Sequence, residues 1–340
     1  MTTPTDTDIA SAGSSESEQT RDTRRVSRLA RTLRELLTLI LRLWALVTAT
    51  FLMLHLVPGD PARAALGPTA PPELIAARTR ALGLDHSMPT QYWDYITGIF
   101  HGNMGRSLLT GQPVADTLTQ QLPATLQIAG AAFVVTMGIA VPLGIVMAVF
   151  TRNGRRRALE TSFTSLSVLL LAVPSFLLAQ GLVYVFAIKL GWFPISGMDG
   201  PESFVLPVIS LSGAPALFLA RMVRAEVVSV LDAEFVRTAR ARRLPSWRIL
   251  VFDVLPNGLT TTLTLGGLLL TGMVASTVFV EQVFSWPGLG STLVSSIQGK
   301  DFPVVQGIVL IYGAAVLVVN FLVDVALEAL DPRPAESRST

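Results

Sequence analysis

Long apolar runs alternate with short charged stretches along most of the chain. Because an α-helix rises about 1.5 Å per residue, about 20 apolar residues cross the ~30 Å hydrocarbon core of a bilayer. Runs that approach or exceed this length occupy residues 36–57, 124–150, 163–188, 204–219, 259–280 and 304–327, and the fourth extends to about 223. The pattern predicts an all-α, polytopic membrane protein with six transmembrane helices.

Composition supports a bilayer environment and excludes several classes of function. Half of the residues are apolar and 15% are charged, and the mean hydropathy is +0.54, which is unusual for a soluble domain. The formal net charge of +2 gives no sign of a nucleic-acid partner. The chain contains no cysteine, and its three histidines lack ligand spacing. The sequence therefore predicts neither a disulfide framework nor a metal site.

The polar stretches divide the chain into further segments. Residues 1–35 are polar and then arginine-rich, and they predict a disordered tail followed by the first span, 36–57. Residues 58–121 predict an extracytoplasmic segment with proline turns. Residues 122–331 predict a core that carries the remaining five spans, and 332–340 predict a short polar tail.

The distribution of basic residues predicts the orientation, because basic loops are retained on the cytoplasmic side. Arginines gather in 21–34, in 152–157 and in 221–248, whereas the long segment 58–121 has few. This asymmetry predicts a multi-pass membrane protein in which both termini and the stretch 232–256 are cytoplasmic.

Three features interrupt the apolar pattern of the later spans. Pro174 predicts a kink in the third run, and Gln180 is the one strongly polar residue of that run. Glu281 follows the fifth run and opens a predicted outer loop, 281–301, around Trp286. Gln180 and Glu281 are candidates for contact with a transported solute, or they satisfy neighbouring helices.

The stretch 232–256 is polar and basic at its start although it lies between two spans. Asp232 is a predicted N-cap, and the ring of Pro245 ends the helix by Arg243 or Leu244 and opens a second helix. The first helix carries Glu234, Arg237, Arg240 and Arg242. It has the size and charge to seat in a cleft of another protein, or it lies on anionic lipid head groups.

The chain lacks the means to drive transport by itself. No carboxylate, lysine or arginine lies at the centre of a predicted span, where ion-coupled carriers place their relays. No phosphate-binding loop and no catalytic set is visible, so we expect neither an enzyme nor a bound cofactor. The open alternatives are a channel or secondary carrier without partners, a carrier driven by a partner, and a membrane scaffold.

Several motifs, in order and at compatible spacing, resemble the importer permeases of the ATP-binding-cassette (ABC) superfamily. The resemblance is to the first permease subunit of the dipeptide, oligopeptide and nickel group, and it covers residues 36 to 332. The motifs are PGDP at 58–61, LGLD at 82–85, GNMGRS at 102–107, LPATL at 122–126, EFVRTARA at 234–241, FSWPGLG at 284–290 and DFPVVQG at 301–307.

The resemblance implies a type I ABC-importer permease fold and a transporter with several subunits. The expected partners are a second homologous permease, two cytoplasmic ATPases that bind ATP and Mg²⁺, and an extracytoplasmic solute-binding protein. In this family the cytoplasmic loop couples ATP hydrolysis to the spans. The positions that match this coupling loop are Glu234, Phe235, Arg237, Thr238, Ala239, Arg240, Arg243, Leu244 and Pro256.

Substrate and loop geometry are the two points that the resemblance leaves open. Peptides are expected, with nickel chelates and other small solutes as alternatives, since neither cysteine nor a histidine cluster favours a metal. The family's loop has glycine where this chain has Arg243. Because glycine alone adopts a left-handed turn without steric cost, we expect strain or a different bend at Arg243.

Overall fold

The computed structural model describes residues 33–53, 55–56, 63, 66, 70–81, 85–154, 156–243, 245 and 248–330. Within these ranges the chain is helical, with one isolated bridge between Arg106 and Pro113 and no strand. Residues 1–32 of the predicted N-terminal tail and the whole predicted C-terminal tail, 332–340, lie outside the described residues. Residues 33–35, which were predicted as tail, already belong to the first helix, Leu33–Met53.

Among the residues that the structure describes, five helices are long and apolar enough to cross a membrane, and a bent pair raises the number to as many as six. The chain divides into two compact units after Thr48. The first holds the described residues 33–48, which are the N-terminal part of helix Leu33–Met53. The second holds the rest of that helix and the following described helices, in this order: α3 (Pro72–Ala81), α4 (Met88–Phe100), α5 (Val114–Thr151), η1 (Arg152–Gly154), α6 (Arg157–Ala172), α7 (Ser175–Leu182), η2 (Val183–Lys189), η3 (Pro201–Phe204), α8 (Val205–Leu231), α9 (Glu234–Ala241), η4 (Ile249–Val254), α11 (Leu255–Phe284), α12 (Leu289–Gln298) and α13 (Phe302–Leu330).

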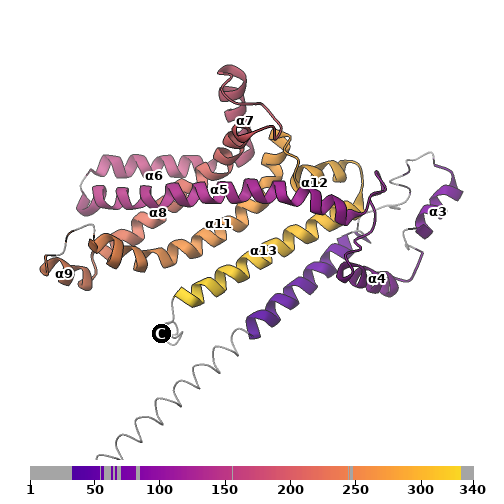
Figure 1. Ribbon diagram of the computed structural model, residues 1–340, viewed down its shortest axis with the longest axis horizontal. Coiled ribbons are helices and arrows are strands. Elements are labelled where there is room, and N and C mark those ends of the chain that lie inside the picture. The colour runs from indigo at the N-terminus through magenta and orange to yellow at the C-terminus, as the bar shows by residue number, and fades with distance from the viewer. Residues whose placement is uncertain are drawn as a thin grey trace, which may run out of the picture. The chain divides into compact units, whose positions relative to one another are not determined.

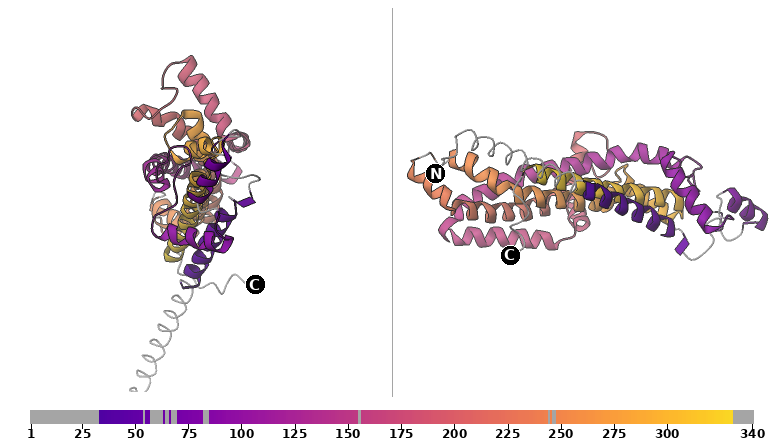
Figure 2. Two further views of the ribbon diagram at one scale, coloured as in Figure 1. Left: turned by 90° about the vertical axis from the view of Figure 1, so that its right-hand side faces the viewer. Right: turned by 90° about the horizontal axis from the view of Figure 1, so that it is seen from below.

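Helices α5 and α8 form the centre of the second unit and lie side by side (Figure 1). Their contact is close because Gly144 of α5 has no side chain: a Cβ atom there would lie 2.6 Å from the carbonyl oxygen of Ala220 and 2.6 Å from Cβ of Val223. Small residues of this kind let helix backbones approach in a membrane. Helix α11 packs on both α5 and α8, and α13 packs on α11, as the two further views in Figure 2 also show.

The predicted third span is not one straight helix. Helices α6 and α7 are joined at Val173 and Pro174, and the axes of the two halves differ by 97°. Val173 has extended backbone angles (φ −85°, ψ 118°) because a following proline disfavours helical geometry. Pro174 therefore produces a break rather than the predicted kink, and α7 turns away from the direction of α6 (Figure 1).

Two helices are longer than the sequence pattern predicted. Helix α5 begins at Val114 and runs through the predicted boundary between 121 and 122. Val114 and Leu118 are buried against Leu289 and the start of α13, so this polar-looking segment has a packed face. Helix α11 ends at Phe284, and α12 occupies 289–298. The predicted outer loop 281–301 is therefore wrong, because most of it is helical.

The described part of the segment between the first helix and α5 is held to the first helix by a hydrogen bond, and that helix is in turn bonded to α13. Thr50 and Tyr95 of α4 share a hydrogen bond of 3.2 Å between their hydroxyl oxygens, and the side-chain amide of Gln306 donates to the carbonyl oxygen of Thr50 (2.9 Å). Burial raises the pKa of the Tyr95 phenol, which keeps the phenol neutral. Helix α4 is thereby fixed to the bundle.

Candidate docking surface at helix α9

Helix α9 is a short amphipathic helix between α8 and η4, at one end of the bundle (Figure 1). Val236 is fully buried in a cluster with Leu231, Ile249 and Val254, and Ala239, three residues further on, packs against the same cluster. Residues three apart share one face of a helix. One face of α9 therefore binds the bundle, and the remaining faces are free for another contact.

Most of the predicted coupling residues in α9 lie on the faces that point away from the bundle, and Ala239 is the exception because it packs against the Val236 cluster. Phe235 is 47% exposed although it is a large aromatic residue. An exposed aromatic side chain beside several arginines is typical of a surface that binds another protein. The exposed side chains of this surface are Glu234, Phe235, Arg237, Thr238, Arg240, Arg242 and Arg243.

Asp232 does not cap α9, contrary to the sequence-based prediction. It is the C-cap of α8, with helical backbone angles, and its carboxylate forms an ion pair with Arg152 (2.5 Å). The N-cap of α9 is Ala233, whose backbone is extended and whose side chain offers no cap. The prediction failed because Asp232 has a distant partner that local sequence cannot reveal.

Arg243 adopts the left-handed conformation, with φ of 55°. Its N–H donates to the carbonyl oxygen of Arg240 (2.9 Å) and ends α9. A residue with a Cβ atom in this conformation costs roughly 1–2 kcal/mol. The strain expected at this position is therefore confirmed, and the chain makes the bend without glycine.

Of the other predicted coupling residues, Leu244 lies outside the described residues, and Pro256 lies in the first turn of α11. The π-helical segment η4 runs directly into this turn. The carbonyl oxygen of Pro245 accepts hydrogen bonds from the N–H groups of Arg248 (3.0 Å) and Ile249 (3.3 Å), which are the bonds of a helical turn. After Pro245, helical structure is described from Arg248 on.

Two arginines fix the end of α8, on which α9 is built, to the α5–α6 turn. Arg224 pairs with Glu160 (2.6 Å) and donates from Nε to the hydroxyl of Thr151 (2.8 Å). Besides its ion pair with Asp232, Arg152 donates to the carbonyl oxygen of Leu231 (3.0 Å). These contacts connect the base of α9 to α5 and α6 through the end of α8. Sequence reasoning missed these residues, because only the fold brings them close.

Gln180 and Glu281, the two candidates for solute contact, lie apart from α9 and in different environments. Gln180 is exposed on α7. Glu281 is fully buried near the end of α11, and both of its carboxylate oxygens accept hydrogen bonds from the protein. The structure does not bring the two together, and contact with a solute stays a prediction for both.

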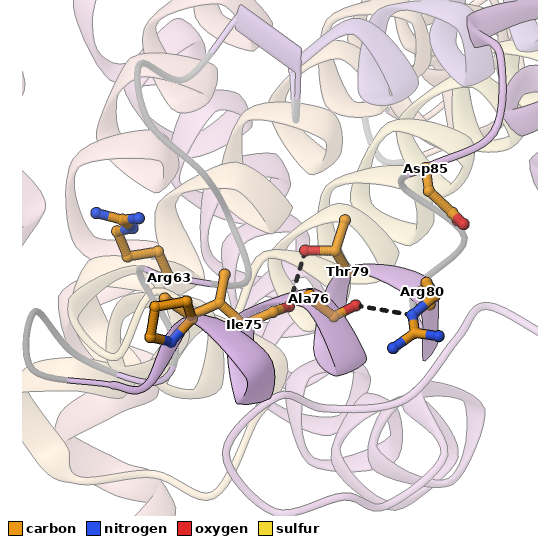
Figure 3. Close-up of a pocket in the computed structure, with 7 residues that line it drawn as sticks. Arg63, Ile75, Ala76, Thr79, Arg80 and Asp85 are labelled. Carbon is orange, nitrogen blue, oxygen red and sulfur yellow. Dashed lines mark hydrogen bonds between the residues drawn. The ribbon is translucent and has the colours of Figure 1, made fainter.

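A pocket of 450 Å³ lies beside α3, outside the spans. Arg63, Ile75, Thr79, Arg80 and Asp85 are among the residues that line it (Figure 3). Within α3, the side chain of Thr79 donates a hydrogen bond to the carbonyl oxygen of Ile75 (2.9 Å), and that of Arg80 donates to the carbonyl oxygen of Ala76 (3.4 Å). Residues 67–69 and 82–84, close to the two ends of α3, lie outside the described residues, so we assign the pocket no ligand.

Comparison with known proteins identifies the family. Residues 140–336 match the family described as binding-protein-dependent transport system inner membrane component. Residues 29–129 match the N-terminal region of such membrane components. Together the two matches include both the α9 surface and the segment that precedes α5.

Curated relatives are similar over most of their length. A Brucella abortus (strain 2308) protein named as a peptide transport system permease is 37% identical over 292 residues, which are 84% of this chain and 92% of that protein. The glutathione transport system permease protein GsiC of Escherichia coli (strain K12) is 34% identical over 297 residues, which are 87% of this chain and 96% of GsiC.

A solved structure shares the fold. A chain of the MetNI methionine ABC transporter, in an inward-facing conformation, superposes with a TM-score of 0.55 at 19% identity, over 63% of this chain and 96% of that chain. The predicted all-α permease fold is confirmed. The chain therefore belongs to the family of binding-protein-dependent transport system inner membrane components, as a multi-pass permease of the bacterial plasma membrane.

Proposed function

We propose that this chain is a permease subunit of an ATP-driven importer that takes up di- or oligopeptides by alternating access. Support for peptides comes from the relatives, whose names specify peptide and glutathione transport. Support for an external energy source comes from the chain itself, whose sequence lacks a phosphate-binding loop. Nickel chelates and other small solutes are the alternative substrates.

The proposed partners are a second homologous permease, two ABC ATPases and an extracytoplasmic solute-binding protein. In this proposal the chain has no cofactor of its own, since ATP and Mg²⁺ bind to the ATPases, and it contacts no nucleic acid. Both termini and α9 face the cytoplasm, consistent with the arginines at 21–34 and in α9.

The observation that carries the proposal is the exposed polar surface of α9 above its buried anchor Val236. We propose that this surface seats in a groove of an ATPase subunit. Phe235 supplies apolar contact area, and Glu234 and the arginines fix the orientation through charge. Nucleotide-driven motion of the ATPase then reaches α5 and α6 through Arg152 and Arg224, which hold the base of α9.

The α9 surface is tested by reversing charge in the complete transporter, reconstituted in liposomes with its binding protein. We expect Glu234→Arg and Arg237→Glu to lower ATP-dependent peptide uptake at least tenfold, since a mispaired charge at an interface costs several kcal/mol. The basal ATPase rate should remain. Lys189→Glu is the matched control, because Lys189 is also exposed but lies in η2, and it should transport normally.

The same liposomes separate the competing classes of function. Peptide uptake by this chain alone would establish a channel or secondary carrier and overturn the importer. No flux with any set of partners would indicate a scaffold. The variant Gln180→Ala tests whether Gln180 contacts the solute. A raised KM for uptake at an unchanged ATPase rate supports this contact, and an unchanged KM contradicts it.

A further inference from the structure

Glu281 is a buried carboxylate that the proposed coupling mechanism does not use. It lies in the last turn of α11, and its side chain has no exposed surface. In the part of the chain that the structure describes, no basic side chain forms an ion pair with it. An uncompensated carboxylate in such a place is costly unless neutral donors satisfy it. Its hydrogen-bond partners therefore reveal its role.

Besides Thr277 of α11 itself, those partners come from two other helices. Oε1 accepts a hydrogen bond from the hydroxyl of Thr125 on α5 (2.8 Å). Oε2 accepts from the backbone N–H groups of Gly290 (2.7 Å) and Ser291 (3.2 Å) in the first turn of α12. The first N–H groups of a helix have no intrahelical acceptor, and they carry the positive end of its dipole. Glu281 thus caps α12 from outside.

Thr125 completes this arrangement. Its hydroxyl oxygen accepts the N–H of Leu289 (2.9 Å) while the hydroxyl donates to Glu281. One residue away, the carbonyl oxygen of Ala124 accepts the indole N–H of Trp286, which is fully buried (3.1 Å). Two side chains therefore satisfy three successive N–H groups of α12 and hold it against α5.

The space around the carboxylate is filled by protein. A Cβ atom on Gly288 would lie 2.4 Å from Oε2 of Glu281 and 2.6 Å from the Thr125 hydroxyl oxygen. A Cβ atom on Gly290 would lie 2.4 Å from Cα of Val278. The glycines allow the backbone to approach this closely. No room is left for a solute, which favours a role in holding α12 over direct contact with substrate.

Helix α12 joins three spans at the end of the bundle opposite α9 (Figure 1). It packs on α5, α11 and α13, and Leu289 lies in a buried cluster with Val114 of α5 and Val304 of α13. After α12, Asp301 accepts hydrogen bonds from the Ser107 hydroxyl and from the N–H of Leu108 (2.9 Å). A change in the spacing of the spans at this end must carry α12 along or break its anchor.

We propose that Glu281 is a positioning residue for transport: its carboxylate, with Thr125, locks α12 to α5 and α11 so that the three move as one body. The role depends on the length of the side chain and on an acceptor oxygen, and it does not depend on negative charge. This proposal depends on the proposed transport function only in the experiments that measure peptide uptake.

The test separates side-chain length from charge at position 281 in the complete reconstituted transporter. Glu281→Gln keeps the length and one acceptor for the α12 amides, so we expect uptake within about threefold of the parent. Glu281→Asp keeps the charge but is too short to reach both helices. The rate of peptide uptake should fall about tenfold or more in this variant, because buried donors are left without an acceptor. The KM for peptide should not change in either variant.

Activity of the Asp variant together with loss of the Gln variant would overturn the proposal, because charge would then be the required property. A raised KM at an unchanged maximal rate in the Gln variant would also overturn it and assign Glu281 to substrate binding. The Thr125→Ser and Thr125→Val pair repeats the test from α5 if the Asp variant does not assemble: Ser keeps the hydroxyl and should transport, and Val should not.

Hydrogen exchange of α12 in the purified transporter gives a readout that does not depend on the substrate. Backbone amides at 289–291 should exchange at the parental rate in Glu281→Gln and faster in Glu281→Asp and Thr125→Val. Equal exchange in all variants would refute the anchor even if peptide uptake were normal. If the amides exchange in the expected pattern but the parent transporter takes up no peptide, the proposed peptide import is refuted and the anchor is not.

Discussion

The two ends of the helix bundle are tied together by different means. At the α9 end the ties are ion pairs of partly exposed side chains, such as Arg224 with Glu160 and Arg152 with Asp232. At the α12 end the ties are hydrogen bonds from neutral donors to a carboxylate with no exposed surface. A surface that meets a partner must keep solvated charge, whereas a closed end can bury its polar groups once each has a partner.

This contrast implies different sensitivities to substitution. Exposed ion pairs contribute little and are weakened by salt. A buried network with every donor satisfied is costly to disturb, since each group that loses its partner remains desolvated. We therefore expect the largest effects at the α12 end and smaller, salt-dependent effects at the α9 end.

The largest effect is expected for Trp286→Ala. Trp286 is fully buried and donates to Ala124, and its ring packs against Phe204 in a T-shaped contact (4.6 Å between centroids). Removing a buried tryptophan should lower the free energy of unfolding by about 3–5 kcal/mol. Thermal unfolding of the purified protein in nanodiscs measures this loss. Trp192→Ala is the control, because Trp192 is 62% exposed. Equal losses of unfolding free energy in both variants would contradict the expectation that burial determines the effect.

An intermediate effect is expected at the α9 end for Glu160→Arg. The change replaces an attractive contact with Arg224 by a repulsive one, and it should cost about 1 kcal/mol of unfolding free energy at low salt. The double variant Glu160→Arg with Arg224→Glu should recover part of the loss. Raising the salt concentration should reduce the difference in unfolding free energy between the Glu160→Arg variant and the parent protein. The same salt series should leave the effect of Thr125→Val unchanged, and a salt-dependent effect there would contradict the distinction between the two ends.

The smallest effect is expected for Arg243→Gly. Glycine adopts the left-handed conformation without steric cost, so relief of strain should stabilise the protein by up to about 1 kcal/mol, offset in part by the greater entropy of glycine in the unfolded chain. Thermal unfolding of the purified protein shows whether the substitution raises or lowers the unfolding free energy. Gly154→Ala is the opposite change at another left-handed position, φ 69°, and should destabilise it. A loss of stability in Arg243→Gly would show that the arginine side chain contributes more than its backbone costs.

The sequence allowed much of the fold to be predicted, because hydrophobic length is a local property. Five of the six apolar runs coincide with helices long and apolar enough to cross a membrane, and the third forms the bent pair of α6 and α7. Pro174 and Arg243 marked the break and the strained bend that the structure contains, and Pro245 accepts the hydrogen bonds of a helical turn. Long-range partners were the source of the errors. Asp232 looked like an N-cap until its ion pair with Arg152 placed it at the end of α8.

The two candidate solute contacts show the same limit. Gln180 and Glu281 looked alike in the sequence, as polar residues within or beside apolar runs. The fold exposes Gln180 and seals Glu281 among Thr125 and the α12 amides. No local signal separates these outcomes, since the donors to Glu281 lie on two helices and Thr125 is more than 150 residues away along the chain.

The sequence by itself determined that this protein is an all-α membrane permease, since apolar length and family motifs can be read along the chain. It also determined that α9 is a charged helix between spans. Only the tertiary structure decided which polar residues meet. It placed α12 in what had been predicted as a loop, joined Glu281 to α5, and connected α9 to α5 and α6 through two arginines. Such contacts depend on distances between segments far apart in the chain, and those distances exist only after the helices pack.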